Sequence, residues 1–268
     1  LRFMRSLTDK PLALNATVEK SSRVYEDRLR QWIDIALEEG IRFFDTSLGN
    51  PRWVVERVAP YGGIVYHKVT ERKWAEKAID AGVHGLIAVN ARAGGHAGHL
   101  SPQQLFDTLA DMGLPILCAG GIGDEKDYAD ALAIGYAGVM MATRFIATTE
   151  CTAHEDYKRA IVQASESDIV HTERVTGVPL AVIKTEYVER VGYKTGVLAR
   201  LMLKHRQLKK LMRLIYALRS MRQLKRSSLQ GKMSTRDYYQ AGKSVAGVHA
   251  VESVSAIMAR FVQYTKPK

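Results

Sequence analysis

The chain has 268 residues, of which 46% are hydrophobic, a formal net charge of +11 and two cysteines. This length and apolar content suffice for one large α/β domain or for a barrel with an appendage. Two cysteines exclude a disulfide framework, so we expect Cys118 and Cys151 to be reduced and structural. The sequence has no run of about eighteen uncharged apolar residues and no signal-peptide pattern at Leu1-Arg2-Phe3-Met4. We therefore predict a cytoplasmic protein without stable membrane insertion.

Short apolar runs alternate with amphipathic stretches up to residue 141. We predict strands at residues 11–15, 41–45, 64–67, 85–89, 115–118 and 137–141. Helices are expected over residues 25–39, just after Pro51, and over 71–81, 102–112 and 124–134. Six β-α repeats with non-alternating apolar strands predict a parallel sheet covered by helices. They fit an open doubly wound sheet, or most of an eight-stranded barrel whose first two strands lie upstream of Leu1.

The pattern changes after Glu150. Residues 152–165 and 198–225 have helical periodicity, and another helix follows the glycine-containing stretch 241–247. We predict three parts: a barrel over 1–150, a helical cap or substrate domain over 151–240, and a segment over 241–268 that returns to the barrel.

The excess positive charge lies in one segment. Residues 190–236 contain fourteen Lys and Arg and no Asp or Glu, so the remaining residues carry 11 minus 14, or −3. Three interpretations of the basic helix 200–226 stay open: a solvated face, recognition of an anionic substrate such as an acyl-CoA, and peripheral membrane contact. Few aromatic residues accompany the charge, which argues against nucleic-acid binding.

Two glycine-rich strand exits concentrate the chemistry. Residues 93–99 read Ala-Gly-Gly-His-Ala-Gly-His, and residues 119–124 read Ala-Gly-Gly-Ile-Gly-Asp. Glycine lets a backbone approach a ligand closely, and histidine suits proton transfer near neutral pH. The second loop, at the start of a helix, predicts phosphate binding, with two ordinary tight turns as the alternative. The remaining histidines have no metal-ligand spacing, so we expect no metal.

Four stretches, residues 9–15, 92–98, 118–124 and 138–150, resemble in this order the motifs of the nitronate monooxygenase family, formerly 2-nitropropane dioxygenases. That family also includes flavin-dependent enoyl-ACP reductases. The resemblance covers nearly the whole chain and implies a TIM-type (β/α)8 barrel with a helical C-terminal cap. It also implies FMN at the carboxyl ends of the strands. The family's first two strands are not visible here, so we expect the N-terminal strands to be missing from this sequence.

The resemblance also implies roles for single residues. His96 resembles the catalytic base, with a structural loop histidine as the alternative and His99 as a weaker candidate. Arg92 stands where many relatives carry Glu, which reverses a charge beside the active-site loop. The residues implied in cofactor binding are Asn15 and Lys68 at the flavin ring, Gly94 and Gly95 against the isoalloxazine, and Ala119, Gly120, Gly121, Ala142 and Thr143 at the phosphate.

The leading hypothesis is an FMN-dependent oxidoreductase that oxidises alkyl nitronates with O₂. One alternative is an NAD(P)H-dependent flavin reductase of enoyl thioesters or quinones. The other is a flavin- or ligand-binding protein with little turnover. All three take a small-molecule ligand, and each is compatible with a homodimer.

Overall fold

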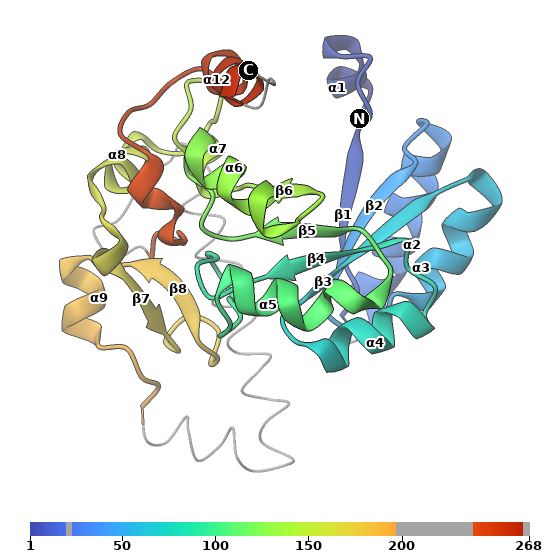
Figure 1. The fold of residues 1–268 in the computed structure, drawn as a ribbon, viewed down its shortest axis with the longest axis horizontal. Helices are drawn as coiled ribbons and strands as arrows, with labels where there is room; N and C mark the ends of the chain where they lie inside the picture. Colours follow the sequence, from blue (N-terminus) through green and yellow to red (C-terminus); the bar gives the residue numbers. More distant parts are fainter. Residues whose placement is uncertain (20–22, 197–237, 265–268) are drawn as a thin grey trace. The chain divides into compact units, whose positions relative to one another are not determined.

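The computed structural model describes residues 1–19, 23–196 and 238–264 (Figure 1). Six strands form one sheet in the order β1 (Ala13–Thr17), β2 (Phe43–Ser47), β3 (Ile64–Val69), β4 (Gly85–Val89), β5 (Ile116–Ala119) and β6 (Gly138–Met140). Neighbours from β1 to β4 pair in parallel. The predicted α/β class, with strands of a TIM-type barrel, is confirmed. The predicted basic helix 200–226 lies outside the described residues.

Amphipathic helices separate the strands, as the apolar spacing predicts. They are α2 (Arg23–Glu38), α3 (Arg52–Val58), α4 (Arg72–Asp80), α5 (Pro102–Leu109) and α6 (Glu125–Ile134). Helix α2 contacts β1, α3 and α4 contact β3, and α5 contacts β4 (Figure 1). The buried residues of α2 recur at helical spacing, at Leu29, Ile33, Ala36 and Leu37. One short helix, α1 (Arg2–Leu7), precedes the first strand and has no buried residue.

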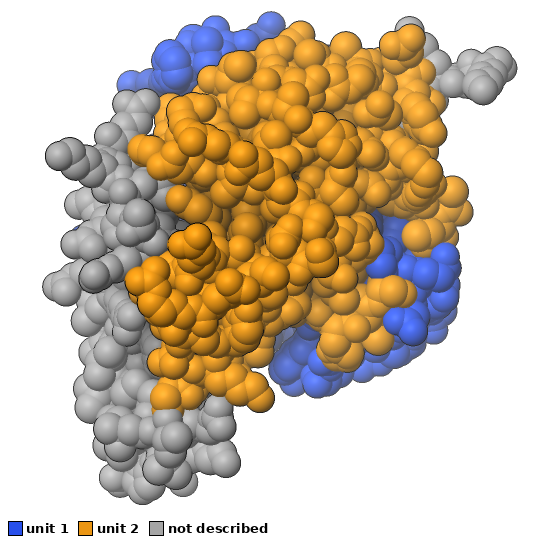
Figure 2. Space-filling model, turned by 90° about the vertical axis from the view of Figure 1, so that its left-hand side faces the viewer, with its two compact units in different colours: residues 1–89, 102–118, 135–138 blue, residues 90–101, 119–134, 139–268 orange. Residues whose placement is uncertain are grey.

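The chain divides into two compact units, coloured in Figure 2. Unit 1 comprises residues 1–89, 102–118 and 135–138, and unit 2 comprises residues 90–101, 119–134 and those after 138. The predicted domain boundaries at residues 150 and 240 stay predictions.

In unit 1, successive side chains along each strand point to opposite faces of the sheet. Ala16, Phe44 and Val65 point to one face and are fully buried. On the opposite face, the rings of Phe43 and Tyr66 lie 5.0 Å apart. Only glycine fits at residue 85, because a Cβ there would lie 2.3 Å from the Tyr66 ring. Two residues further along β2 and β3, this second face carries Asp45 and Lys68.

Unit 2 corrects one expectation. The predicted helical cap contains a two-stranded antiparallel sheet of β7 (Ile169–Thr172) and β8 (Leu180–Ile183), alongside the helices α8 (Glu155–Gln163) and α9 (Glu186–Val191) (Figure 1). Sequence reasoning missed these strands because each has only four residues and an apolar run that short has no decisive period. After the second gap come a short 3-10 helix, Lys243–Gly247, and α12 (Val254–Tyr264).

Candidate functional site

A polar cluster lies on one face of the sheet in unit 1. Asn15 on β1 is the register partner of Asp45 on β2, so both side chains point to the same face. Lys68 on β3 places its Nζ 2.9 Å from Asp45 Oδ2 and 3.3 Å from Asn15 Oδ1. The sheet therefore brings together Asn15 and Lys68, the two residues for which the family resemblance implies a role at the flavin ring. It adds Asp45, which sequence reasoning did not single out.

On the opposite face, a histidine is buried beside this cluster. His67 Nδ1 lies 2.8 Å from Thr46 Oγ1, and the Thr46 hydroxyl also lies 3.0 Å from the Tyr66 carbonyl oxygen. Burial, together with the positive charge of Lys68, lowers the pKa of His67 to about 4. A neutral imidazole bonded to a hydroxyl is a structural element of the sheet, so His67 is no candidate for proton transfer at neutral pH.

In unit 2, a single buried side chain connects the two glycine-rich loops. Asn90, which directly follows β4, is fully buried. Its Nδ2 donates to the Gly120 carbonyl at 2.9 Å, and its Oδ1 accepts from the Arg92 N–H at 2.8 Å. Its own N–H donates to the Ala119 carbonyl at 3.0 Å. Sequence reasoning missed Asn90, although a polar residue at the exit of an apolar strand was the available signal.

The glycines of these loops are required by close backbone contacts. Gly120 has φ +116°, and a Cβ there would lie 2.5 Å from the Ala93 nitrogen. A Cβ on Gly94 would lie 2.8 Å from the nitrogen of Gly242. A Cβ on Gly123 would lie 2.1 Å from the Ser244 carbonyl oxygen. Residues 242–244 thus pack against both loops, where no side chain separates the backbones.

Ala142 and Thr143, the last two residues predicted to bind the phosphate, lie next to the same C-terminal segment. Thr143, which is buried, begins the short helix α7 (Thr143–Ile146) directly after Ala142. Its Oγ1 accepts from the Gly242 N–H at 3.2 Å, so the Thr143 hydroxyl hydrogen stays available for another acceptor. The next residue, Arg144, is 1% exposed and forms an ion pair with Glu252. It also donates to the Ala250 carbonyl at 3.1 Å, which fixes the C-terminal segment to α7.

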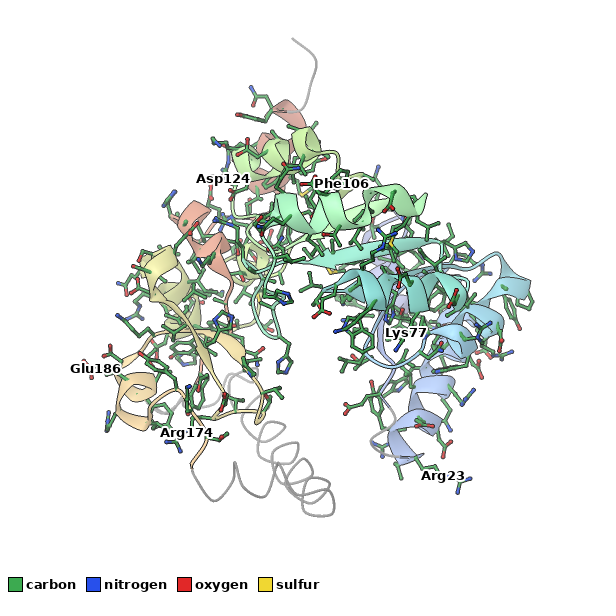
Figure 3. The ribbon with its side chains drawn as sticks, turned by 60° about the horizontal axis from the view of Figure 1, so that its bottom comes forward. Arg23, Lys77, Phe106, Asp124, Arg174 and Glu186 are labelled. Atoms are coloured by element: carbon green, nitrogen blue, oxygen red, sulfur yellow. The ribbon has the colours of Figure 1, made fainter. Side chains whose placement is uncertain are left out.

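At the start of α6, carboxylates take up backbone N–H groups that the sequence predicts to be available to a phosphate. Asp124, labelled in Figure 3, accepts from the Asp127 N–H at 2.8 Å. Asp127 in turn accepts from the Gly123 N–H at 2.8 Å, and burial raises the pKa of this carboxyl. These carboxylates occupy N–H donors that an anion at the helix start would need. The remaining candidate donors are the backbone at Gly120 and Gly121 and the residues Ala142 and Thr143.

The side chain of Arg92 lies beside the glycine-rich loop that contains Gly121. A Cβ on Gly121, which has φ +85°, would lie 2.5 Å from Nε of Arg92, so the Arg92 side chain runs along this turn. Arg92 forms an ion pair with Glu166. The positive charge at residue 92 is therefore balanced within unit 2 by a carboxylate of the 3-10 helix Glu166–Asp168.

His96 is exposed and held in one tautomer. Its Nδ1 lies 2.9 Å from the Pro179 carbonyl oxygen. A carbonyl only accepts, so Nδ1 carries the hydrogen and Nε2 of the neutral ring is an acceptor. The Gly95 carbonyl accepts from the Ala181 N–H at 2.7 Å, which joins the loop to β8. His99 is also exposed.

Two kinds of site are absent from the part of the chain that the structure describes. No group of three or more His, Cys, Asp or Glu residues there could hold a metal ion. Among the same residues, no helix is long and apolar enough to cross a membrane.

Comparisons with known proteins connect this geometry to a family. The family model described as Nitronate monooxygenase matches residues 1–263. A (3aS,4S,5R,7aS)-5-hydroxy-7a-methyl-1-oxo-octahydro-1H-indene-4-carboxyl-CoA dehydrogenase of Mycobacterium tuberculosis is 31% identical over 192 residues, which cover 70% of this chain and 52% of the relative. A probable nitronate monooxygenase of Staphylococcus saprophyticus is 29% identical over 180 residues, covering 62% of this chain and 51% of the relative.

A solved structure is similar over almost the whole chain. FabK from Thermotoga maritima has a TM-score of 0.78 at 25% sequence identity, and the match covers 98% of this chain and 78% of FabK. The chain spans about half the length of the two curated relatives named above. Since the family model matches residues 1–263, the chain belongs to the nitronate monooxygenase family.

Proposed function

We propose that this protein is an FMN-dependent oxidoreductase in which His96 exchanges a proton with the substrate. The hydrogen bond from His96 Nδ1 to the Pro179 carbonyl carries this proposal. It leaves Nε2 as the lone-pair nitrogen of an exposed ring, which is what a general base requires. Oxidation of a nitroalkane by way of its nitronate fits, because Nε2 can remove the proton from the nitroalkane carbon next to the nitrogen and so form the nitronate.

Each unit, taken by itself, carries residues that the family resemblance assigns to FMN. In unit 2, Gly120 and Gly121 bring bare backbone close to a ligand, Thr143 keeps a hydroxyl donor, and Arg92 supplies a positive charge beside the turn. In unit 1, Asn15 and Lys68 provide polar groups for the carbonyls of the pyrimidine ring. FMN, when bound, would accept two electrons and pass them to O₂.

A second substrate class is favoured by a separate observation. The M. tuberculosis relative carries the name of a CoA-thioester dehydrogenase. Residues 190–236 of this chain carry fourteen basic side chains and no acidic one, a composition that suits the phosphates of CoA. On this alternative His96 exchanges a proton with the carbon next to a thioester carbonyl, and NAD(P)H is the electron donor in the reductive direction.

Anaerobic spectroscopy of the purified protein tests these proposals. Flavin absorbance lost on adding propyl nitronate supports nitronate oxidation, and loss only with NADPH supports the reductase. Flavin that neither reagent bleaches supports a ligand-binding protein with little turnover. A protein that shows no flavin spectrum after FMN is supplied refutes the proposed function.

The role of His96 has its own matched variants. His96→Ala should slow bleaching by 1-nitropropane, the neutral nitroalkane that still carries the proton, by about 100-fold or more, the usual contribution of general acid–base catalysis. His99→Ala removes an exposed imidazole from the same loop and should leave the rate unchanged. Equal rates for His96→Ala and the unsubstituted protein would exclude His96 as the base.

A further inference from the structure

We propose that Asp45 is a positioning residue that neutralises Lys68 and thereby lowers the reduction potential of the bound flavin. This inference rests on the proposed function, which places a flavin pyrimidine beside Lys68. The juxtaposition that carries it is the ion pair between Lys68 Nζ and Asp45 Oδ2, at 2.9 Å, on one face of the unit 1 sheet.

The pair is well shielded from water. The Asp45 side chain is 8% exposed and the Lys68 side chain is 20% exposed. Because solvent screens such a pair weakly, each charge strongly affects the field that the other produces. This distinguishes Asp45 from the exposed Asp34, whose pair with Arg57 leaves both side chains at least 40% exposed.

Among the described residues, the carboxylate of Asp45 has no second counter-charge. Its Oδ1 is buried and finds no hydrogen-bond partner in the same part of the chain. Asn15 accepts from Lys68 at 3.3 Å and adds no charge. His67, on the opposite face, stays neutral because its pKa is lowered to about 4. The negative charge of Asp45 therefore acts chiefly on Lys68.

The consequence for a bound flavin follows from charge. Reduction places negative charge on the pyrimidine end of the ring system, and a nearby ammonium stabilises that charge. An ammonium already paired with a carboxylate does so less. With Asp45 present, the cluster of Asn15, Asp45 and Lys68 is neutral overall, so the oxidised flavin is favoured relative to a cluster that contains Lys68 alone.

A double-mutant cycle on the flavin midpoint potential tests this role. Asp45→Asn keeps the shape and an acceptor for Lys68 but removes the charge, so the potential should rise. Lys68→Met should lower it. The double variant, which carries neither charge, should return toward the potential of the unsubstituted protein, whose cluster is also neutral overall. Asp34→Asn is the control and should leave the potential unchanged.

The outcomes separate this inference from the proposed function. An unchanged or lowered potential in Asp45→Asn, with flavin bound, overturns the inference alone. So does a double variant whose potential stays as low as that of Lys68→Met, since the charge of Asp45 would then not offset that of Lys68. If the unsubstituted protein binds no FMN, the proposed function fails and takes this inference with it.

Discussion

Replacing Asn90 by alanine should loosen both glycine-rich loops of unit 2. The substitution removes the bond from Nδ2 to the Gly120 carbonyl and the bond from the Arg92 N–H to Oδ1. Both partners are backbone groups, and Asn90 itself is fully buried. A backbone group that loses its partner inside a protein costs about 1–3 kcal/mol, so the two together predict a loss of about 2–6 kcal/mol.

The assay must report on unit 2 specifically. The three tryptophans, Trp32, Trp53 and Trp74, all lie in unit 1, so their fluorescence does not follow these loops directly. Hydrogen–deuterium exchange of peptides from residues 90–101 and 119–124 does. A loss of about 2–6 kcal/mol corresponds to exchange that is about 30-fold to about 10⁴-fold faster, if the loops open locally.

A matched variant identifies the bond responsible. Asn90→Asp keeps an acceptor for the Arg92 N–H but cannot donate to the Gly120 carbonyl when ionised. Peptide 119–124 should then exchange faster while peptide 90–101 changes less. If Asn90→Ala leaves exchange of both peptides within about twofold of the unsubstituted protein, the Asn90 side chain does not hold the loops together.

Two further perturbations test the buried polar groups. The pKa of His67 is about 4 in the folded protein and 6.5 in the reference state, so the unfolded chain binds a proton that the folded protein does not. The free energy of unfolding should therefore be highest above pH 6.5 and should fall by about 3 kcal/mol as the pH decreases toward 4. Urea unfolding followed by tryptophan fluorescence should therefore show a smaller loss between pH 7 and pH 4.5 for His67→Gln, and identical profiles would contradict the assignment. Glu252→Gln leaves the buried Arg144 guanidinium without its carboxylate and should cost about 3 kcal/mol or more. Thermal unfolding followed by circular dichroism measures this loss. The control is Asp130→Asn, which breaks an exposed ion pair with Lys126. Equal melting temperatures for Glu252→Gln and the unsubstituted protein would contradict the predicted loss.

Local sequence signals were enough to predict the six strands of the main sheet and the glycine-rich loops that follow two of them. A run such as Gly85-Leu86-Ile87-Ala88-Val89 is apolar at every position, as a strand buried on both faces requires, and β4 spans these same residues. Helix ends marked by glycine were equally readable, since Gly40 and Gly82 have φ of +80° and +84°. Both signals lie within a few residues of the element that they mark.

The parts that sequence reasoning missed depend on partners that are remote in the chain. The Lys68–Asp45 pair exists because β2 and β3 are neighbours in a particular register, and the polar residue at one strand end does not reveal its partner on the next. The tautomer of His96 is set by Pro179, 83 residues away. Arg92 reads as an unbalanced charge reversal until Glu166, 74 residues away, is placed beside it. Composition and spacing carry no information on such pairs.

The two glycine-rich loops of unit 2 are completed by the C-terminal segment, so the candidate site depends on a distant part of the chain. Gly94, Gly123 and Thr143 each contact a residue between 242 and 244. Contacts between residues this far apart form only after a large loop-closure entropy has been paid. A Cβ at Gly94 or Gly123 would clash with the backbone of residues 242–244 whether or not FMN is bound. The packing of that backbone therefore requires glycine at both positions, independently of any ligand. In this chain close packing of the backbone is by itself a physical cause for the glycine at residue 94, and substitution of Gly94 tests that cause without any cofactor present.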